Sequence, residues 1–291
     1  MGKQVQYGGQ AVIEGVMMMG SGASAIAVRK PSNEIVIKES SLNFLSSKYS
    51  WLKWPLVRGC ISLFESLALG MQAITWSASQ AGESQEEQLK PWEIVVTVAI
   101  AVGLGIGLFI VIPVFFAAQT LPYVGQFGRS ALEGLIRVGL FLGYIIAIGQ
   151  MKDIQRIFAY HGAEHKTISA FEAGEELIPE KIKKYSTIHP RCGTSFILMV
   201  IILTIFIFTF VGQTDVYTRI LIKIAMMPVV AGLAYELIKF SAKHPNIKVI
   251  QALIAPGLWL QKLTTREPNE SQLEVAVTAL NAVINRTAAL E

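Results

Sequence analysis

Residues 94–118 read IVVTVAIAVGLGIGLFIVIPVFFAA, a stretch of 25 positions without a charged side chain. An α-helix rises about 1.5 Å per residue, so this stretch is long enough to cross a hydrocarbon core of about 30 Å. We therefore predict a transmembrane helix here. Its presence makes a membrane protein the first class to consider for the whole chain.

The composition of the whole chain supports that class. Of its 291 residues, 52% are hydrophobic and 16% are charged, with a mean hydropathy of +0.48. A soluble domain carries about 25% charged residues. The net charge is +4 and the 25 Lys and Arg residues are spread along the chain, so a nucleic-acid partner is not expected. Cys60 and Cys192 are the only cysteines, and two distant cysteines exclude a disulfide scaffold.

Further apolar runs bring the expected number of membrane spans to about four. They cover residues 131–150, 196–212 and 220–238. Glu133 and Arg137 interrupt the first of them at an i, i+4 spacing, which allows them to pair on one helix face. Glu236, near the end of the last run, is the other carboxylate that Arg137 can reach. Charged residues inside spans are costly, and they mark ion pairs or polar cavities.

The distribution of Lys and Arg predicts the topology. Residues 56–78 are only patchily hydrophobic, which favours an interfacial or re-entrant helix over a fifth span. With four spans, both termini and residues 152–195 share one side. That side holds eight Lys and Arg before the first span, seven in the central segment and six after the last span. The opposite side has Arg129 and Arg219, with Arg137 and Lys223 at the span margins, so the basic side is expected to be cytoplasmic.

The first fifty residues have the pattern of a small β-sheet. Residues 25–30 and 34–38 alternate apolar and polar side chains around a Pro-Ser-Asn turn, which predicts a hairpin. Residues 10–18 give a third strand. Glu14 lies in that apolar run, where a buried and unpaired carboxylate would cost several kcal/mol. We expect it either to face solvent or to reach a cation or a metal.

The chemistry is concentrated in the central segment. Three of the four histidines, His161, His165 and His189, fall within 29 residues. His161 and His165 are spaced i, i+4, so a helix would place both on one face, as a metal site requires. Glu172 returns to that face two turns later. His161 and Glu172 lie about three helical turns apart on that face, which is too far for one ion to bind both. A third ligand must therefore come from elsewhere in the chain.

The order H-x-x-E-H is that of the inverted zincin motif, in which two histidines hold Zn²⁺ and the glutamate acts as base. Here these residues are His161, His165 and Glu164, and either His189 or Cys192 completes the site. We favour Cys192, because thiolate is a strong zinc ligand. Two other interpretations stay open. The histidines can form a polar face or bind lipid phosphates, and Cys192 can be a nucleophile with His189 or His165 as its base.

Four separated motifs together resemble the bacterial YqhQ family, a family without an established function. They are GGQAVIEGVMM at 8–18, YHGAEHKTISAFEAGEEL at 160–177, HPRCGTSF at 189–196 and APGLWLQKLTTREP at 255–268. The resemblance extends over nearly the whole chain. Members of that family are labelled metal-dependent enzymes, so the resemblance implies metal chemistry without naming a substrate.

The expected fold is mainly α-helical: a multi-pass protein of the bacterial inner membrane with both termini cytoplasmic. We expect a β-rich subdomain at 1–50, an interfacial helix and linker at 51–91, membrane helices at 92–151, a histidine-rich segment at 152–195, membrane helices at 196–240 and C-terminal helices at 241–291.

Two functions fit this reading. The first is a divalent-metal hydrolase, with zinc as the expected ion, that acts on a lipid head group or a membrane-proximal peptide and has Glu164 as its base. The second is a non-enzymatic transport or assembly protein. There the His, Glu and Cys residues form a structural metal clip or a gate, and the chain is expected to form a homo-oligomer. Membrane lipids are partners in both.

Overall fold

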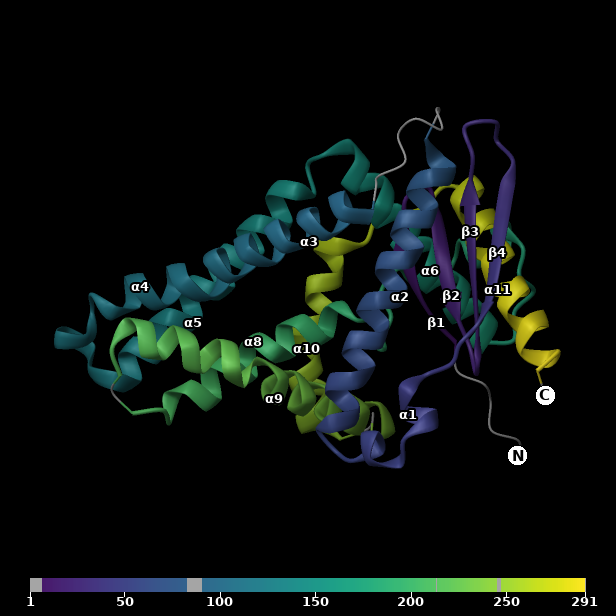
Figure 1. Cartoon of the computed structure of the whole chain (residues 1–291). Coiled ribbons are helices and arrows are strands. Elements are labelled where there is room, and N and C mark those ends of the chain that lie inside the picture. The colour runs from purple at the N-terminus through teal and green to yellow at the C-terminus, as the bar shows by residue number, and fades with distance from the viewer. Residues whose placement is uncertain (1–6, 83–90, 213, 245–246, 291) are drawn as a thin grey trace.

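A computed structural model describes residues 7–82, 91–212, 214–244 and 247–290. Its two parts are a small sheet covered by helices and a long bundle of helices that extends away from the sheet (Figure 1). The predicted fold class is confirmed in its coarse form, a mainly helical chain with an N-terminal antiparallel sheet.

The sheet has four strands that pair in chain order: β1 (Gly8–Val12), β2 (Gly15–Met19), β3 (Ala23–Arg29) and β4 (Ile35–Ser41). The predicted hairpin is β3–β4, and Asn33 at its turn has a φ of 68°. The single strand expected over residues 10–18 is wrong. The chain reverses at Glu14, whose φ of 51° lies in the left-handed region, and thereby forms β1 and β2.

Helices cover both faces of the sheet. On one face, Val16, Ala25 and Ala27 pack with Leu273 and Leu280 of α11 (Glu270–Ala288) in a core that also includes α6 (Lys152–Glu172). On the other face, Val12, Met17 and Val28 pack against Ala73 of α2 (Val57–Ala81). The predicted C-terminal helix therefore docks on the sheet, and Asn269 caps it through a reciprocal capping box with Gln272.

The bundle begins with a single long helical rod. It consists of α3 (Pro91–Ile106), a π-helical turn η3 (Gly107–Val111) and α4 (Ile112–Ala118). The chain returns through α5 (Leu121–Ile148), and the remaining bundle helices are α8 (Thr194–Thr209), α9 (Val216–Lys243) and α10 (Lys248–Thr264). Short helical turns lie at α1 (Leu45–Lys48), η1 (Ser50–Lys53) and α7 (Pro179–Ile182).

Within the described residues, three helices have the length and composition to cross a membrane: 92–118, 122–148 and 216–241. They correspond to three of the four expected spans. The expected span at 196–212 is α8, an apolar helix of 16 residues that is shorter than the other three.

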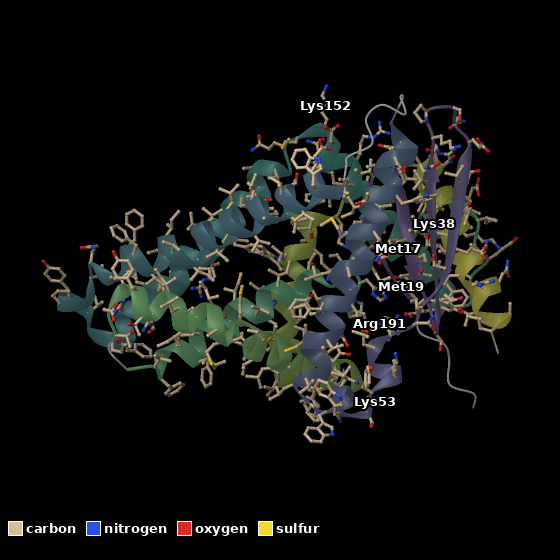
Figure 2. All side chains as sticks on the ribbon, in the orientation of Figure 1. Met17, Met19, Lys38, Lys53, Lys152 and Arg191 are labelled. Carbon is tan, nitrogen blue, oxygen red and sulfur yellow. The ribbon has the colours of Figure 1, made fainter. Side chains whose placement is uncertain are left out.

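Helix α2, which corresponds to the expected interfacial helix, connects the bundle to the sheet. Its first turns pack closely on α9, because a Cβ on Gly59 would lie 3.0 Å from the Cα of Gly232. Its later residues contact the sheet, and Phe64 and Leu67 remain exposed. The labelled basic residues Lys38, Lys53, Lys152 and Arg191 all lie at the sheet end of the molecule (Figure 2).

Candidate metal centre

Helix α6 carries the two histidines predicted to share a face. His165 is buried and His161 is half-buried, and their ring centroids lie 4.3 Å apart. The i, i+4 spacing thus brings two imidazoles to one point, as the sequence pattern predicts.

Backbone carbonyls orient both rings. His161 Nδ1 lies 2.9 Å from the carbonyl oxygen of Thr264, and His165 Nδ1 lies 2.6 Å from that of Thr187. A carbonyl only accepts, so each Nδ1 carries the proton and donates it. Each Nε2 then keeps a lone pair that can bind a metal, and the Nε2 of His161 faces Cys192 Sγ. A metal-ligating histidine usually donates from one ring nitrogen to a carbonyl and binds the ion through the other.

Cys192 supplies the third ligand atom. Its Sγ lies 3.2 Å from His161 Nε2, and the ligand atoms of His161, His165 and Cys192 all lie within 4.8 Å of one another. A tetrahedral zinc ion with bonds of about 2.0–2.3 Å separates its ligand atoms by about 3.5 Å. The three side chains therefore need only small adjustments to hold one ion. The residues fit a zinc ion in donor type as well, with two imidazoles and one thiol.

Glu164 is buried beside this group but is not part of it. The backbone N–H of Gly9 in β1 donates to its carboxylate. A Cβ on Gly9 would lie 2.9 Å from Glu164 Cγ, so only glycine lets the strand approach this closely. Burial raises the pKa of Glu164 to about 7, against the opposing effect of the nearby His161.

The other pKa shifts at the site also come mainly from burial. Burial, with a contribution from His161, lowers the pKa of His165 to about 3, so that ring stays neutral and able to bind a metal. Burial raises the pKa of the Cys192 thiol. A nearby cation would counter that rise, because a metal ion stabilises the thiolate that binds it.

Close packing brings distant segments together around the site. A Cβ on Gly162 would lie 2.0 Å from the carbonyl oxygen of Arg266, so this glycine lets α6 approach the end of α10. Gln261 of α10 fixes the loop before Cys192, because its side chain accepts from His189 N at 2.8 Å and donates to His189 O at 2.9 Å.

His189 and Glu172, both candidates from the sequence, lie outside the three-ligand group. His189 Nδ1 accepts from Arg191 N at 3.3 Å, and its Nε2 lies 3.7 Å from a carboxylate oxygen of Glu172. Glu172 also forms an ion pair with Arg191. These two residues brace the loop that presents Cys192.

The remaining candidates form ion pairs elsewhere. Glu14 pairs with Arg156 and accepts from Tyr160 Oη at 3.4 Å, so it reaches a cation and not the histidine group. Arg137 pairs with Glu133 at 2.9 Å, which is the predicted i, i+4 pair. Glu236, the other partner considered for Arg137, pairs with Arg58 of α2 instead.

Sequence reasoning missed the residues that support the site. Gly9 and Gly162 lie in the quoted motifs, and a glycine beside a candidate ligand is a visible signal for close approach. The carbonyls of Thr187 and Thr264 leave no such signal, because every residue has one.

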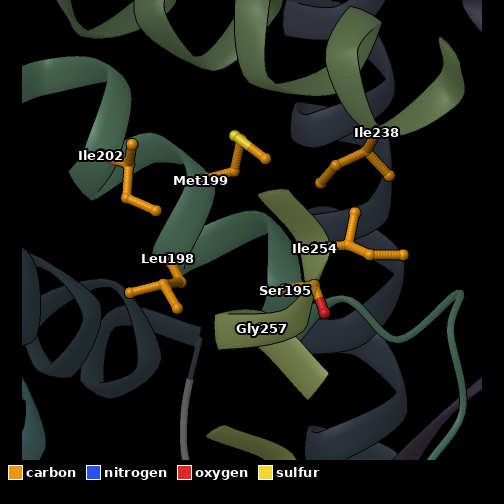
Figure 3. Close-up of a pocket in the computed structure, with 7 residues that line it drawn as sticks. All are labelled: Ser195, Leu198, Met199, Ile202, Ile238, Ile254 and Gly257. Carbon is orange, nitrogen blue, oxygen red and sulfur yellow. The ribbon is translucent and has the colours of Figure 1, made fainter. Parts of the chain in front are cut away.

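An apolar crevice lies next to the centre, between α8, α9 and α10 (Figure 3). Leu198, Met199, Ile238 and Ile254 line it, and Ser195 forms its polar edge. Ser195 N donates to the Cys192 carbonyl at 3.2 Å, so this edge adjoins the cysteine loop.

The fold and the site together define a helical protein with membrane-compatible helices and a His-His-Cys group beside a small sheet. The family model described as "Protein of unknown function (DUF1385)" matches residues 54–286, and the chain belongs to this family. It is also 32% identical to the "Uncharacterized protein YqhQ" of Bacillus subtilis (strain 168), over 98% of this chain and 94% of that relative. No solved structure matches the chain.

Proposed function

We propose that this chain is a multi-pass membrane protein that holds zinc at the membrane surface and hydrolyses a lipid head group. One observation carries the proposal: two imidazoles with carbonyl-fixed Nδ1 atoms converge with one thiol. Three protein ligands leave one position of a tetrahedral ion open, and this is the arrangement of catalytic zinc sites. Zinc held there would supply a Lewis acid and would lower the pKa of water.

Glu164 is the proposed general base. It lies close enough to His161 and Cys192 to interact with both electrostatically, but it stays outside the ligand group. A pKa of about 7 suits a group that must take up and release a proton near neutral pH. Its Gly9 contact holds the carboxylate in place, so the proton would be taken up at a fixed oxygen.

A lipid substrate is supported by the position of the site. Cys192 lies just before the apolar helix α8, so the metal centre adjoins the end of a helix of the proposed membrane bundle. In the proposed topology α8 completes a fourth crossing. At about 1.5 Å per residue its 16 residues extend about 24 Å, so the bilayer would thin around it. Four crossings would put both termini and the metal centre on one side, and the many basic residues of that side favour the cytoplasm.

A structural metal clip is less well supported. Such a site needs four protein ligands, and in the described ranges only His161, His165 and Cys192 form the group. The open position therefore favours catalysis over a purely structural role.

The test compares the wild type with Glu164→Gln in vesicles made from bacterial total lipids. We expect the wild type to release a water-soluble head-group product, detected by mass spectrometry. The variant should release none and should keep its zinc, because the amide cannot act as a base and Glu164 is not a ligand. Equal product release from both proteins would contradict the role of Glu164 as the base. Loss of zinc from the variant would instead show that Glu164 is a zinc ligand.

A further inference from the structure

A second concentration of charge lies in the bundle, at the end remote from the sheet. Four cationic side chains are buried there: Arg129 and Arg137 of α5, and Arg219 and Lys223 of α9. Each is at most 5% exposed. Together they form the basic cluster of the bundle.

The basic cluster has too few carboxylates. Glu133 is 3.1 Å from Arg219 Nε, 2.9 Å from Arg137 Nη2 and 2.6 Å from Lys223 Nζ. In the part of the chain that the structure describes, no other carboxylate pairs with the four cations. Among the described residues one carboxylate therefore faces four basic side chains, and Glu133 alone cannot neutralise all of them. Burying an uncompensated charge costs several kcal/mol, so this excess calls for an anion.

The unpaired donors are concentrated on two arginines. Arg129 donates through Nη1 to the Thr214 carbonyl at 3.1 Å, whereas its Nε and Nη2 are buried and have no partner among the described residues. Arg219 contacts Glu133 and Ser130, whereas its buried Nη1 has no partner in the same part of the chain. The Thr214 hydroxyl is likewise buried and without a partner in the residues that the structure describes. Arg219 Nη2 donates to the hydroxyl of Ser130, the residue next to Arg129, at 3.0 Å, so the two arginines meet at the same turn of α5.

The shape of these donors indicates the class of ligand. A guanidinium group presents N–H donors in a planar fork that matches the oxygens of a phosphate. Arg129 has an Nε and an Nη2 free, which is one edge of such a fork. A phosphate group offers two oxygens to that edge, one for each N–H, whereas a monatomic anion offers a single acceptor.

We propose that the basic cluster binds a phosphate group through Arg129 and Arg219, at the end of the bundle remote from the metal centre. The phosphate comes either from inorganic phosphate or from the head group of a phospholipid beside the bundle. This also explains why Arg129 and Arg219 lie on the side of the membrane that the positive-inside rule leaves poor in basic residues.

The experiment uses the full chain purified in an uncharged, phosphate-free detergent. One arm titrates it with inorganic phosphate in a calorimeter. The other arm incubates it with phosphatidylglycerol or with diacylglycerol, which lacks the phosphate, and counts bound lipids by native mass spectrometry. Saturable binding in the first arm identifies free phosphate as the ligand. Retention of phosphatidylglycerol but not diacylglycerol identifies the lipid. Binding in neither arm overturns the proposal.

Arg129→Gln should weaken the observed binding by about tenfold or more, since it removes charge-assisted hydrogen bonds. Lys239→Gln is the matched control: it removes one positive charge from the other end of α9 and should bind as the wild type does. Binding by Arg129→Gln at the wild-type level overturns the proposal. If that variant does not fold, Arg129→Lys decides, because it keeps the charge and loses the fork. Weakening of at least about threefold supports the site, and unchanged binding overturns it.

Discussion

The hydrogen bonds of two histidines determine what the candidate centre can bind. Each imidazole donates from Nδ1 to a carbonyl, which leaves Nε2 as its metal-binding atom, and the Nε2 of His161 faces Cys192 Sγ. Without these carbonyls either nitrogen could carry the proton, and the same three residues would be a poorer ligand set. The chemistry therefore depends on the backbone at Thr187 and Thr264 as much as on the ligands.

We predict that His161→Ala and His165→Ala each abolish stoichiometric zinc binding, because two remaining ligands do not hold the ion tightly. His244→Ala is the matched control, since His244 contacts Phe240 at the end of α9 and has no neighbour in the ligand group. Metal analysis of the purified proteins checks this. A full zinc complement in either of the first two variants would rule out the assigned ligands.

At the scale of elements, the site depends on how closely α6 meets the end of α10. Gly162→Ala should destabilise the protein by about 1–3 kcal/mol, the usual cost of overpacking, because its Cβ would lie 2.0 Å from the Arg266 carbonyl oxygen. To make room for this Cβ, the end of α10 would have to move away from α6. That movement would displace the Thr264 carbonyl that orients His161 and would weaken zinc binding. Gly139→Ala in α5 is the control, since a Cβ there meets nothing within 4 Å. Thermal unfolding and metal content measure both effects, and equal behaviour of the two variants would refute the prediction.

The ion pairs between α5 and α9 lead to another prediction at this scale. Glu133→Gln should destabilise the bundle more than Arg137→Leu. The first change removes the carboxylate partner of Arg137, Arg219 and Lys223, whereas the second removes only one of these cations. Breaking a buried pair costs about 3–5 kcal/mol. Thermal unfolding in detergent compares the stability of the two variants. A larger loss of stability for Arg137→Leu would show that Glu133 is not the centre of the network.

At the scale of the whole molecule, the topology that we propose would put the sheet, α6 and the metal centre on one side of the membrane. We predict that single cysteines at positions 25 and 180 are protected from a reagent added outside the cell and that one at position 124 is labelled. These cysteines are introduced into a chain that lacks Cys60 and Cys192. The reverse labelling pattern would invert the topology and move the site to the outer surface.

Much of this arrangement follows from local patterns in the sequence. The apolar runs, the β3–β4 hairpin and the shared face of His161 and His165 need only periodicity and turn chemistry. Glu14 shows where such reasoning fails, because a left-handed φ at a glutamate is not expected and the chain reverses there. The alignment of β1 against Glu164 and the carbonyls facing the histidines depend on contacts between distant segments. The expected topology puts Arg129 and Arg219 on one side of the spans, but no local pattern indicates that their side chains meet.

The central claim is that His161, His165 and Cys192 bind one zinc ion. Zinc X-ray absorption of the full chain, purified without chelators, tests it most directly. We predict one sulfur at about 2.3 Å and two imidazole nitrogens at about 2.0–2.1 Å, with one further light atom. The sulfur should vanish in Cys192→Ser and persist in Cys60→Ser. Absence of bound zinc, or a sulfur shell unchanged in Cys192→Ser, would refute this ligand assignment.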